Sequence, residues 1–207
     1  MKKKSFCLLL LTAVLLFCAA CGQMQTVQPE DTGDKDQYMP DPVPEGKPAP
    51  VEPQDSNVDA DTKYTCTISI SCETILDNMD KCAESKKALV PEDGIILPAT
   101  EVTFSDGESV FDVLQRVCRD NAIHMESNWT PMYNSAYVEG INNLYEFDVG
   151  SLSGWMYNVN GWYPNYGCGV YYVKPGEVIE WNYTCDLGLD LDGGWWEGAQ
   201  DWKDNHD

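Results

Sequence analysis

The chain has 207 residues, with 34 Asp and Glu against 13 Lys and Arg, so its formal net charge at pH 7 is -21. This charge excludes nucleic acid as a partner, because one polyanion repels another. A hydrophobic content of 43% with 7 Trp and 11 Tyr is enough for a folded core, and 9 Cys are typical of an exported protein whose thiols can oxidise.

The first twenty residues are typical of a bacterial export signal. Three lysines at positions 2–4 precede the apolar run Phe6–Phe17, and Ala19-Ala20-Cys21 follows. That run is about 12 residues long, too short for a membrane-spanning helix, which needs about 20. Its end resembles a bacterial lipobox, which implies that 1–20 is a signal peptide and that Cys21 is diacylated, anchoring the protein to the outer face of the cell membrane. The alternative is simple secretion with a free Cys21.

Residues 21–62 are predicted to form the lipid anchor and a disordered linker. Positions 22–62 contain seven Pro and ten acidic residues, but no Leu, Ile, Phe or Trp. Such a composition cannot bury a core, and its prolines favour extended chain. A docking peptide for a partner is the alternative interpretation.

A folded domain is predicted over 63–188. Alternating apolar residues over 64–71 indicate its first strand, and 101–104 a second. Ser109 followed by Asp112 is typical of a capping box, and the apolar spacing over 110–117 predicts a helix.

Later in the chain, a polar and aromatic stretch over 124–144 precedes a strand at 153–159 and the tight turn Asn160-Gly161. Residues 169–173 and 178–184 are predicted as a second hairpin around the turn Lys174–Glu177. Residues 189–207 form an acidic tail, in which an oxygen-rich calcium loop at Asp190–Gly194 is the weaker alternative.

The segment Gly154–Cys168, together with Lys174–Trp181, resembles the transcobalamin-like C-terminal domain of bacterial surface lipoproteins of unknown function. That family is related to the C-terminal β domain of intrinsic factor and transcobalamin. The resemblance implies an α+β fold, a β-grasp-like mixed sheet packed on one main helix and preceded by the disordered linker. It also implies non-catalytic binding of a ligand, with a corrinoid such as cobalamin as the ligand class.

Flat side chains and glycines gather in one loop between the predicted strands. They are expected to hold the ligand, because a Pro- and Gly-containing loop can present aromatic rings in a defined shape. The candidate ligand-binding residues are Trp162, Tyr163, Asn165, Tyr166, Gly167 and Gly169. The aromatic residues of the strands are instead expected to pack the core.

An even number of cysteines in the folded part predicts disulfides rather than a zinc site, since no Cys-x-x-Cys spacing occurs. The candidates are Cys66, Cys72, Cys82, Cys118, Cys168 and Cys185. A link from Cys66 or Cys72 to Cys185 would join the first and last strands. No metal site or cofactor is predicted.

Catalytic motifs are absent from the sequence. The chain has 2 His, His124 and His206, and no motif for a serine nucleophile, a zinc hydrolase or a phosphate-binding loop. The sequence therefore predicts a binding protein rather than an enzyme. Two alternatives remain open: a structural or adhesive surface protein that binds another protein or wall glycan, and a carbohydrate hydrolase with a carboxylate pair.

Overall fold

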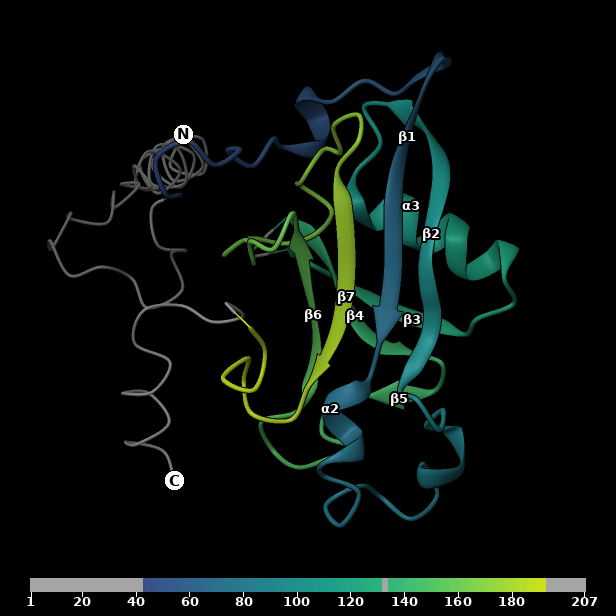
Figure 1. The fold of residues 1–207 in the computed structure, drawn as a ribbon. Helices are drawn as coiled ribbons and strands as arrows, with labels where there is room; N and C mark the ends of the chain where they lie inside the picture. The colour runs from purple at the N-terminus through teal and green to yellow at the C-terminus, as the bar shows by residue number, and fades with distance from the viewer. Residues whose placement is uncertain (1–42, 132–133, 193–207) are drawn as a thin grey trace, which may run out of the picture. The chain divides into compact units, whose positions relative to one another are not determined.

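A computed structural model of the chain describes residues 43–131 and 134–192. The predicted signal peptide, the Cys21 anchor, the linker up to residue 42, His206 and most of the acidic tail lie outside the described residues. Two β-sheets and one main helix make up the described part (Figure 1). Among the described residues, no helix combines the length and apolar character that crossing a membrane requires.

The larger sheet has four strands in the order β2-β1-β7-β6. These strands are β1 (Asp59–Ser71), β2 (Ile95–Asp106), β6 (Gly154–Val159) and β7 (Val178–Thr184). The two central strands run parallel, with Thr67 beside Val178 and Ser71 beside Asn182, whereas β2 and β6 pair antiparallel at the edges. This mixed sheet, with its one main helix, confirms the predicted β-grasp-like α+β fold.

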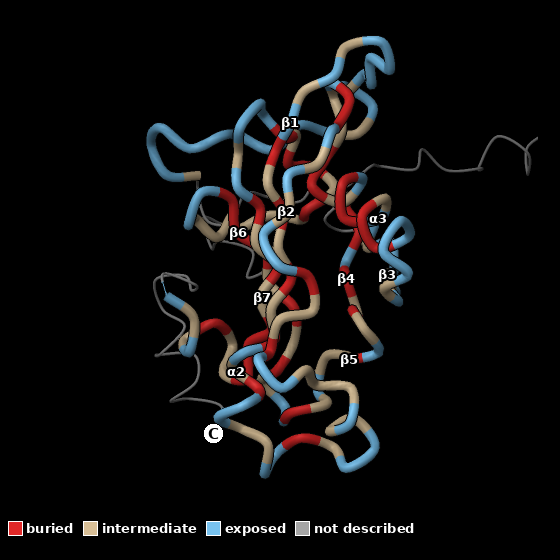
Figure 2. Tube along the Cα trace, turned by 45° about the vertical axis from the view of Figure 1, so that its right-hand side comes forward, coloured by how far each residue is buried: buried red, intermediate tan, exposed pale blue. Residues whose placement is uncertain are grey.

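One face of the four-stranded sheet is buried and the other is polar. On β1, Cys66, Ile68 and Ile70 are buried, whereas the intervening Thr67 and Ser69 are half-buried. On β7, Ile179, Trp181 and Tyr183 are buried in the same alternating way. Because side chains alternate across a strand, the apolar set faces the core and the polar set forms an outer face. In Figures 1 and 2 the helix α3 and the second sheet lie together on the core side.

The helix α3 spans Val110–Asp120 and begins with the predicted capping box. The Ser109 N–H donates to Asp112 Oδ2 at 2.8 Å, and the Asp112 N–H donates to Ser109 Oγ at 3.2 Å. These bonds satisfy donors that have no partner within the helix. The face that packs against the sheet carries the fully or almost fully buried Val110, Val113, Leu114 and Val117. Burying each such side chain stabilises the fold by about 1.5–3 kcal/mol.

The second sheet occupies the stretch in which no strand was predicted. Its strands β3 (Met125–Thr130), β4 (Ser135–Ile141) and β5 (Leu144–Tyr145) are antiparallel in the order β3-β4-β5. The turn between β4 and β5 is Asn142-Asn143, with positive φ at both residues (54° and 57°). Asparagine tolerates this conformation, so a pair of asparagines replaces the Asn-Gly pair that marks most such turns.

The predicted strand at 169–173 is wrong, although both neighbouring turns are confirmed by their positive φ at Asn160, Gly161 and Gly176. The backbone of this segment bonds to the start of α3 instead of to β7. The Val110 N–H donates to Tyr171 O at 2.9 Å, and the Phe111 N–H donates to Cys168 O at 3.2 Å. Both sides of β7 are already occupied, by β1 and β6.

Short elements complete the described chain: the 3-10 turns η2 (Pro53–Asp55) and η3 (Lys87–Leu89), and the single-turn helix α2 (Glu73–Leu76) that follows β1. Strand β1 begins at Asp59, so the expected linker boundary at residue 62 falls inside it. Asp59 pairs with Asp106 of β2. A polar, acidic segment has no apolar alternation from which this backbone pairing could be predicted.

Candidate functional site

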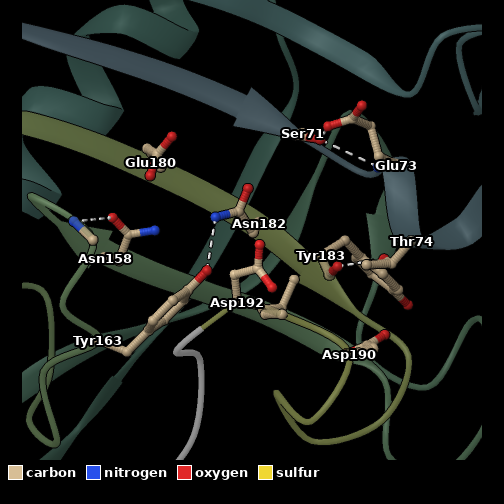
Figure 3. Close-up of a pocket in the computed structure, with 12 residues that line it drawn as sticks. Ser71, Glu73, Thr74, Asn158, Tyr163, Glu180, Asn182, Tyr183, Asp190 and Asp192 are labelled. Carbon is tan, nitrogen blue, oxygen red and sulfur yellow. Dashed lines mark hydrogen bonds between the residues drawn. The ribbon is translucent and has the colours of Figure 1, made fainter.

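A pocket of about 500 Å³ opens on the outer face of the four-stranded sheet. Strands β1, β6 and β7 form its floor, the Asn160-Gly161 turn and Tyr163 border it on one side, and residues 190–192 border it on another (Figure 3). This volume is in the range of small-molecule sites. The lining residues are Ser71, Glu73, Thr74, Asn158, Gly161, Tyr163, Glu180, Asn182, Tyr183, Asp190, Leu191 and Asp192.

Four carboxylates, and no Lys, Arg or His, line this pocket: Glu73, Glu180, Asp190 and Asp192. Two of them are held in place. Asp190 accepts bonds from the Thr184 hydroxyl and from the Cys185 N–H at 2.8 Å, and Glu73 accepts one from the Ser71 hydroxyl at 3.1 Å. Among the described residues, no hydrogen bond or ion pair engages the carboxylate of Glu180 or of Asp192, which both line the pocket. The pocket therefore offers negative charge and free acceptor atoms to a ligand.

The phenol of Tyr163 stands over the sheet on the outer face. Its oxygen accepts a hydrogen bond from Asn182 Nδ2 at 2.9 Å, which leaves its own proton available for donation (Figure 3). Burial raises the pKa of Tyr163, although hydrogen bonds from Asn158 and Asn182 oppose this shift. The phenol is thus a neutral donor at physiological pH, beside carboxylates that accept.

Of the aromatic residues predicted to bind the ligand, the structure brings only Tyr163 to this pocket. Trp162 forms a bridge with Val159 across the tight turn, and packs against the core. Tyr166 stacks on the buried Tyr171 with ring centroids 6.1 Å apart. Residues that face each other across a two-residue turn have their side chains on the same side of the hairpin. Trp162 therefore lies on the core side with Val159, and Tyr163 lies on the outer face with Asn158.

The other predicted loop residues lie outside the pocket lining. Asn165 is half-buried, and the two glycines approach β4 closely. A Cβ on Gly167 would lie 2.1 Å from Ser135 Oγ, and one on Gly169 would lie 3.0 Å from the same atom. The Gly169 N–H also donates to Ser135 Oγ at 2.9 Å. These contacts give both glycines a packing role between the loop and the second sheet.

Sequence reasoning missed the polar floor of the pocket. Ser71, Glu180 and Asn182 alternate with the core residues of β1 and β7, and that alternation is visible in the sequence. What the sequence does not show is that β1 and β7 are neighbours, which places these polar side chains together. Asp190 and Asp192 were assigned to the acidic tail, and the structure places both at the pocket.

All six cysteines of the predicted disulfide framework are buried, and the structure has each as a free thiol. Burial raises the pKa of Cys66 and Cys185 to about 11, and that of Cys72, Cys118 and Cys168 to about 12. Cys72 directly follows β1, and Cys185 directly follows its parallel neighbour β7. Disulfide formation among these residues stays a prediction.

No group of three or more metal-ligating side chains gathers among residues 43–131 and 134–192. His124 immediately precedes β3, and its Nε2 is 3.5 Å from the Tyr145 hydroxyl, which in turn donates to Glu126. None of these three residues lines the pocket.

Comparison with protein families finds one match within this part of the chain. Residues 107–185, from just before α3 to just after β7, match the "Domain of unknown function (DUF4430)". This segment includes Asn158, Tyr163, Glu180 and Asn182 of the pocket, but neither β1 nor the aspartates at 190 and 192. No curated protein matches the chain.

Two solved structures are similar at low identity. Haptocorrin in complex with Cbi aligns with a TM-score of 0.45 and 16% identity, over 62% of this chain and 26% of the haptocorrin chain. A "putative metal binding protein" from Ruminococcus gnavus aligns with a TM-score of 0.33 and 14% identity, over 58% of this chain and 96% of that protein. The chain thus spans about a quarter of haptocorrin, and at these values neither likeness determines a ligand for it.

Proposed function

We propose that the protein is a non-catalytic ligand-binding lipoprotein on the extracytoplasmic face of a bacterial membrane. The observation that supports binding is the outer-face pocket, in which four carboxylates, two asparagines and two tyrosines surround a volume of about 500 Å³. Anchoring follows from the lipobox-like Ala19-Ala20-Cys21.

The negative charge of the pocket determines which kind of ligand it can bind. A ligand that is cationic, or that has many N–H or O–H donors, would meet acceptors at Glu180 and Asp192, whereas an anion would be repelled. A corrinoid has this chemistry, because its rim carries carboxamide N–H donors and its cobalt centre is positively charged. Since a corrinoid is larger than the pocket, one edge of it would enter, with amide groups against the carboxylates.

The alternative, an adhesive surface protein, is supported by the exposed aromatic residues of the second sheet and the turn after it. Trp129 is 50% exposed, Tyr137 44% and Phe147 63%. Exposed rings of this size are enriched where proteins contact one another or stack on sugars. Binding to wall glycan or a protein through this surface would leave the pocket unused.

Titration of cobinamide and cobalamin into the mature protein distinguishes the two proposals. We expect a Kd of micromolar or tighter, weakened at least tenfold (about 1.4 kcal/mol) by Glu180→Gln and by Tyr163→Ala. Glu101→Gln is the matched control, because Glu101 pairs with Thr67 on the same sheet face but outside the pocket lining. Flat titrations with all proteins folded would reject the corrinoid, and equal affinity in all three variants would reject the pocket.

Anchoring is tested separately, by metabolic labelling with a radioactive fatty acid. We expect label in the wild-type protein and none in Cys21→Ser, with the wild type in the membrane fraction and the variant released. Labelling that survives in Cys21→Ser would contradict the assignment of the anchor.

A further inference from the structure

A short segment ahead of β1 lies against the loop that was expected to bind the ligand. We call residues Lys47–Glu52 the strap. The Tyr166 hydroxyl donates to Pro48 O at 2.7 Å, and the Val51 N–H donates to Val170 O at 3.0 Å. Lys47 Nζ lies 5.2 Å from the ring centroid of Trp162, in the geometry of a cation–π contact. Three separate groups of the loop therefore recognise three positions of the strap.

The last residue of the strap, Glu52, has the backbone conformation of a polyproline helix. Glu52 has φ -64° and ψ 140°, and Pro48, Pro50 and Pro53 follow one another at short intervals. At the last residue of the strap, Glu52 Oε2 accepts a hydrogen bond from Asn134 Nδ2 at 2.6 Å. In Figure 1 this part of the chain, in dark blue, passes beside the yellow-green loop that precedes β7.

These features match one known way of recognising peptides, in which aromatic rings and a hydrogen-bond donor hold an extended, proline-containing chain. We propose that the surface formed by Trp162, Tyr166 and Val170 is a docking site for an extended proline-containing segment with a basic residue, filled here in cis by the strap. Prolines reduce the conformational entropy that such a segment loses on binding, because the free segment is already extended.

The strap is a surface segment. Lys47, Pro48, Val51 and Glu52 are all exposed, so their contacts with the loop are made at the edge of solvent. An interaction of this size can open and close without unfolding the sheet. When it opens, Trp162 and Tyr166 are left for another segment of the same chemistry.

Nuclear magnetic resonance of the full mature chain tests the proposal without any ligand for the pocket. Val51→Pro removes the N–H that Val170 O accepts, yet suits a polyproline backbone. Ala49→Pro is the matched control, because no described hydrogen bond uses the Ala49 N–H. We expect backbone order parameters of the strap to fall from about 0.85 to below about 0.6 in Val51→Pro and to stay high in Ala49→Pro. Tyr166→Phe, which removes only the hydroxyl, should behave as Val51→Pro does.

A synthetic peptide of residues 45–55 is then added to the Val51→Pro chain. We expect a saturable shift of the Trp162 indole N–H signal, and an affinity at least tenfold lower for a peptide with Lys47→Gln. Unchanged strap order in Val51→Pro and Tyr166→Phe would overturn docking in cis. Absence of any shift at millimolar peptide, with the signals of β1 and β7 in place, would overturn the docking site itself.

Discussion

At Gly167 the structure leaves no room for a side chain. The place of its missing side chain is filled by Ser135, which is itself 1% exposed and fixed at the start of β4. Neither backbone can withdraw without moving a strand or the segment that bonds to α3. Glycine is therefore required there by close approach rather than by an unusual φ.

We expect Gly167→Ala to lower the free energy of unfolding by about 1–3 kcal/mol, because a buried contact must be pushed apart. Gly154→Ala is the control, since a Cβ at Gly154 would lie at an ordinary 3.6 Å from Glu146 Cβ. Urea unfolding of both variants measures the difference. Equal stability of the two would show that the Ser135 contact relaxes freely.

Of the predicted ligand-binding residues, the sequence placed Tyr163 correctly at a pocket, and it predicted the wrong environment for several of the others. Tyr163 was found because it is a flat side chain beside a marked turn, but the same argument also selected Trp162 and Tyr166, which face the core and the strap. The direction of each ring depends on the register of the turn, which positions residues one by one. Composition alone cannot distinguish them.

Among the elements, those with strong local signals were predicted well. Helix α3 was predicted from its capping box and apolar face, and β7 from an apolar run after a Pro-Gly turn. In both, the residues that decide the structure lie within a few positions of one another. The expected residues 178–184 coincide with the observed bounds of β7.

Elements that depend on distant partners were missed. Strand β3 is rich in polar residues and largely exposed, whereas β4 is mostly buried, so neither shows the regular apolar alternation that predicts a strand. Residues 168–173 have the composition of a strand, but bond to the first turn of α3. Tertiary partners thus override local preference where the local signal is weak.

For the molecule as a whole, the six buried thiols link its redox state to its stability. Burial raises the pKa of Cys118 to about 12 from an ordinary value of 9.0, and raises the pKa of the other five thiols as well. In the unfolded chain these thiols ionise near pH 9, whereas in the folded chain they keep their protons. Their contribution to stability is therefore complete below pH 9 and is lost as the pH rises from 9 towards 12.

We expect the free energy of unfolding of the reduced protein to fall between pH 9 and pH 10 by up to about 1.4 kcal/mol for each thiol that stays protonated on folding. Tyrosines whose pKa is raised on folding add a smaller share for each residue, because an unfolded tyrosine is only half ionised at pH 10. The share of the thiols is therefore taken from the difference between samples that differ only in their thiols. Urea unfolding at pH 8, 9 and 10 with a reductant measures the slope.

Two comparisons check the assignment of this slope to thiols. In Cys118→Ala, the free energy of unfolding should fall less steeply with pH, by the contribution of one thiol. In the protein purified without reductant, the fall should be smaller still, because thiols joined in the predicted disulfides no longer ionise. An identical slope in the reduced and oxidised samples, with mass spectrometry showing six thiols in both, would contradict the predicted disulfides.

The parallel pairing of β1 with β7 also determines when the four-stranded sheet can form during synthesis of the chain. The central strand β1 comes first along the described chain, and its parallel neighbour β7 comes last among the described strands. A nascent chain that ends before Val178 has no partner for the inner edge of β1, and β6 has none at all. The four-stranded sheet therefore stays incomplete until β7 has been made, and an export machinery that accepts only unfolded chains would have that interval in which to engage the chain.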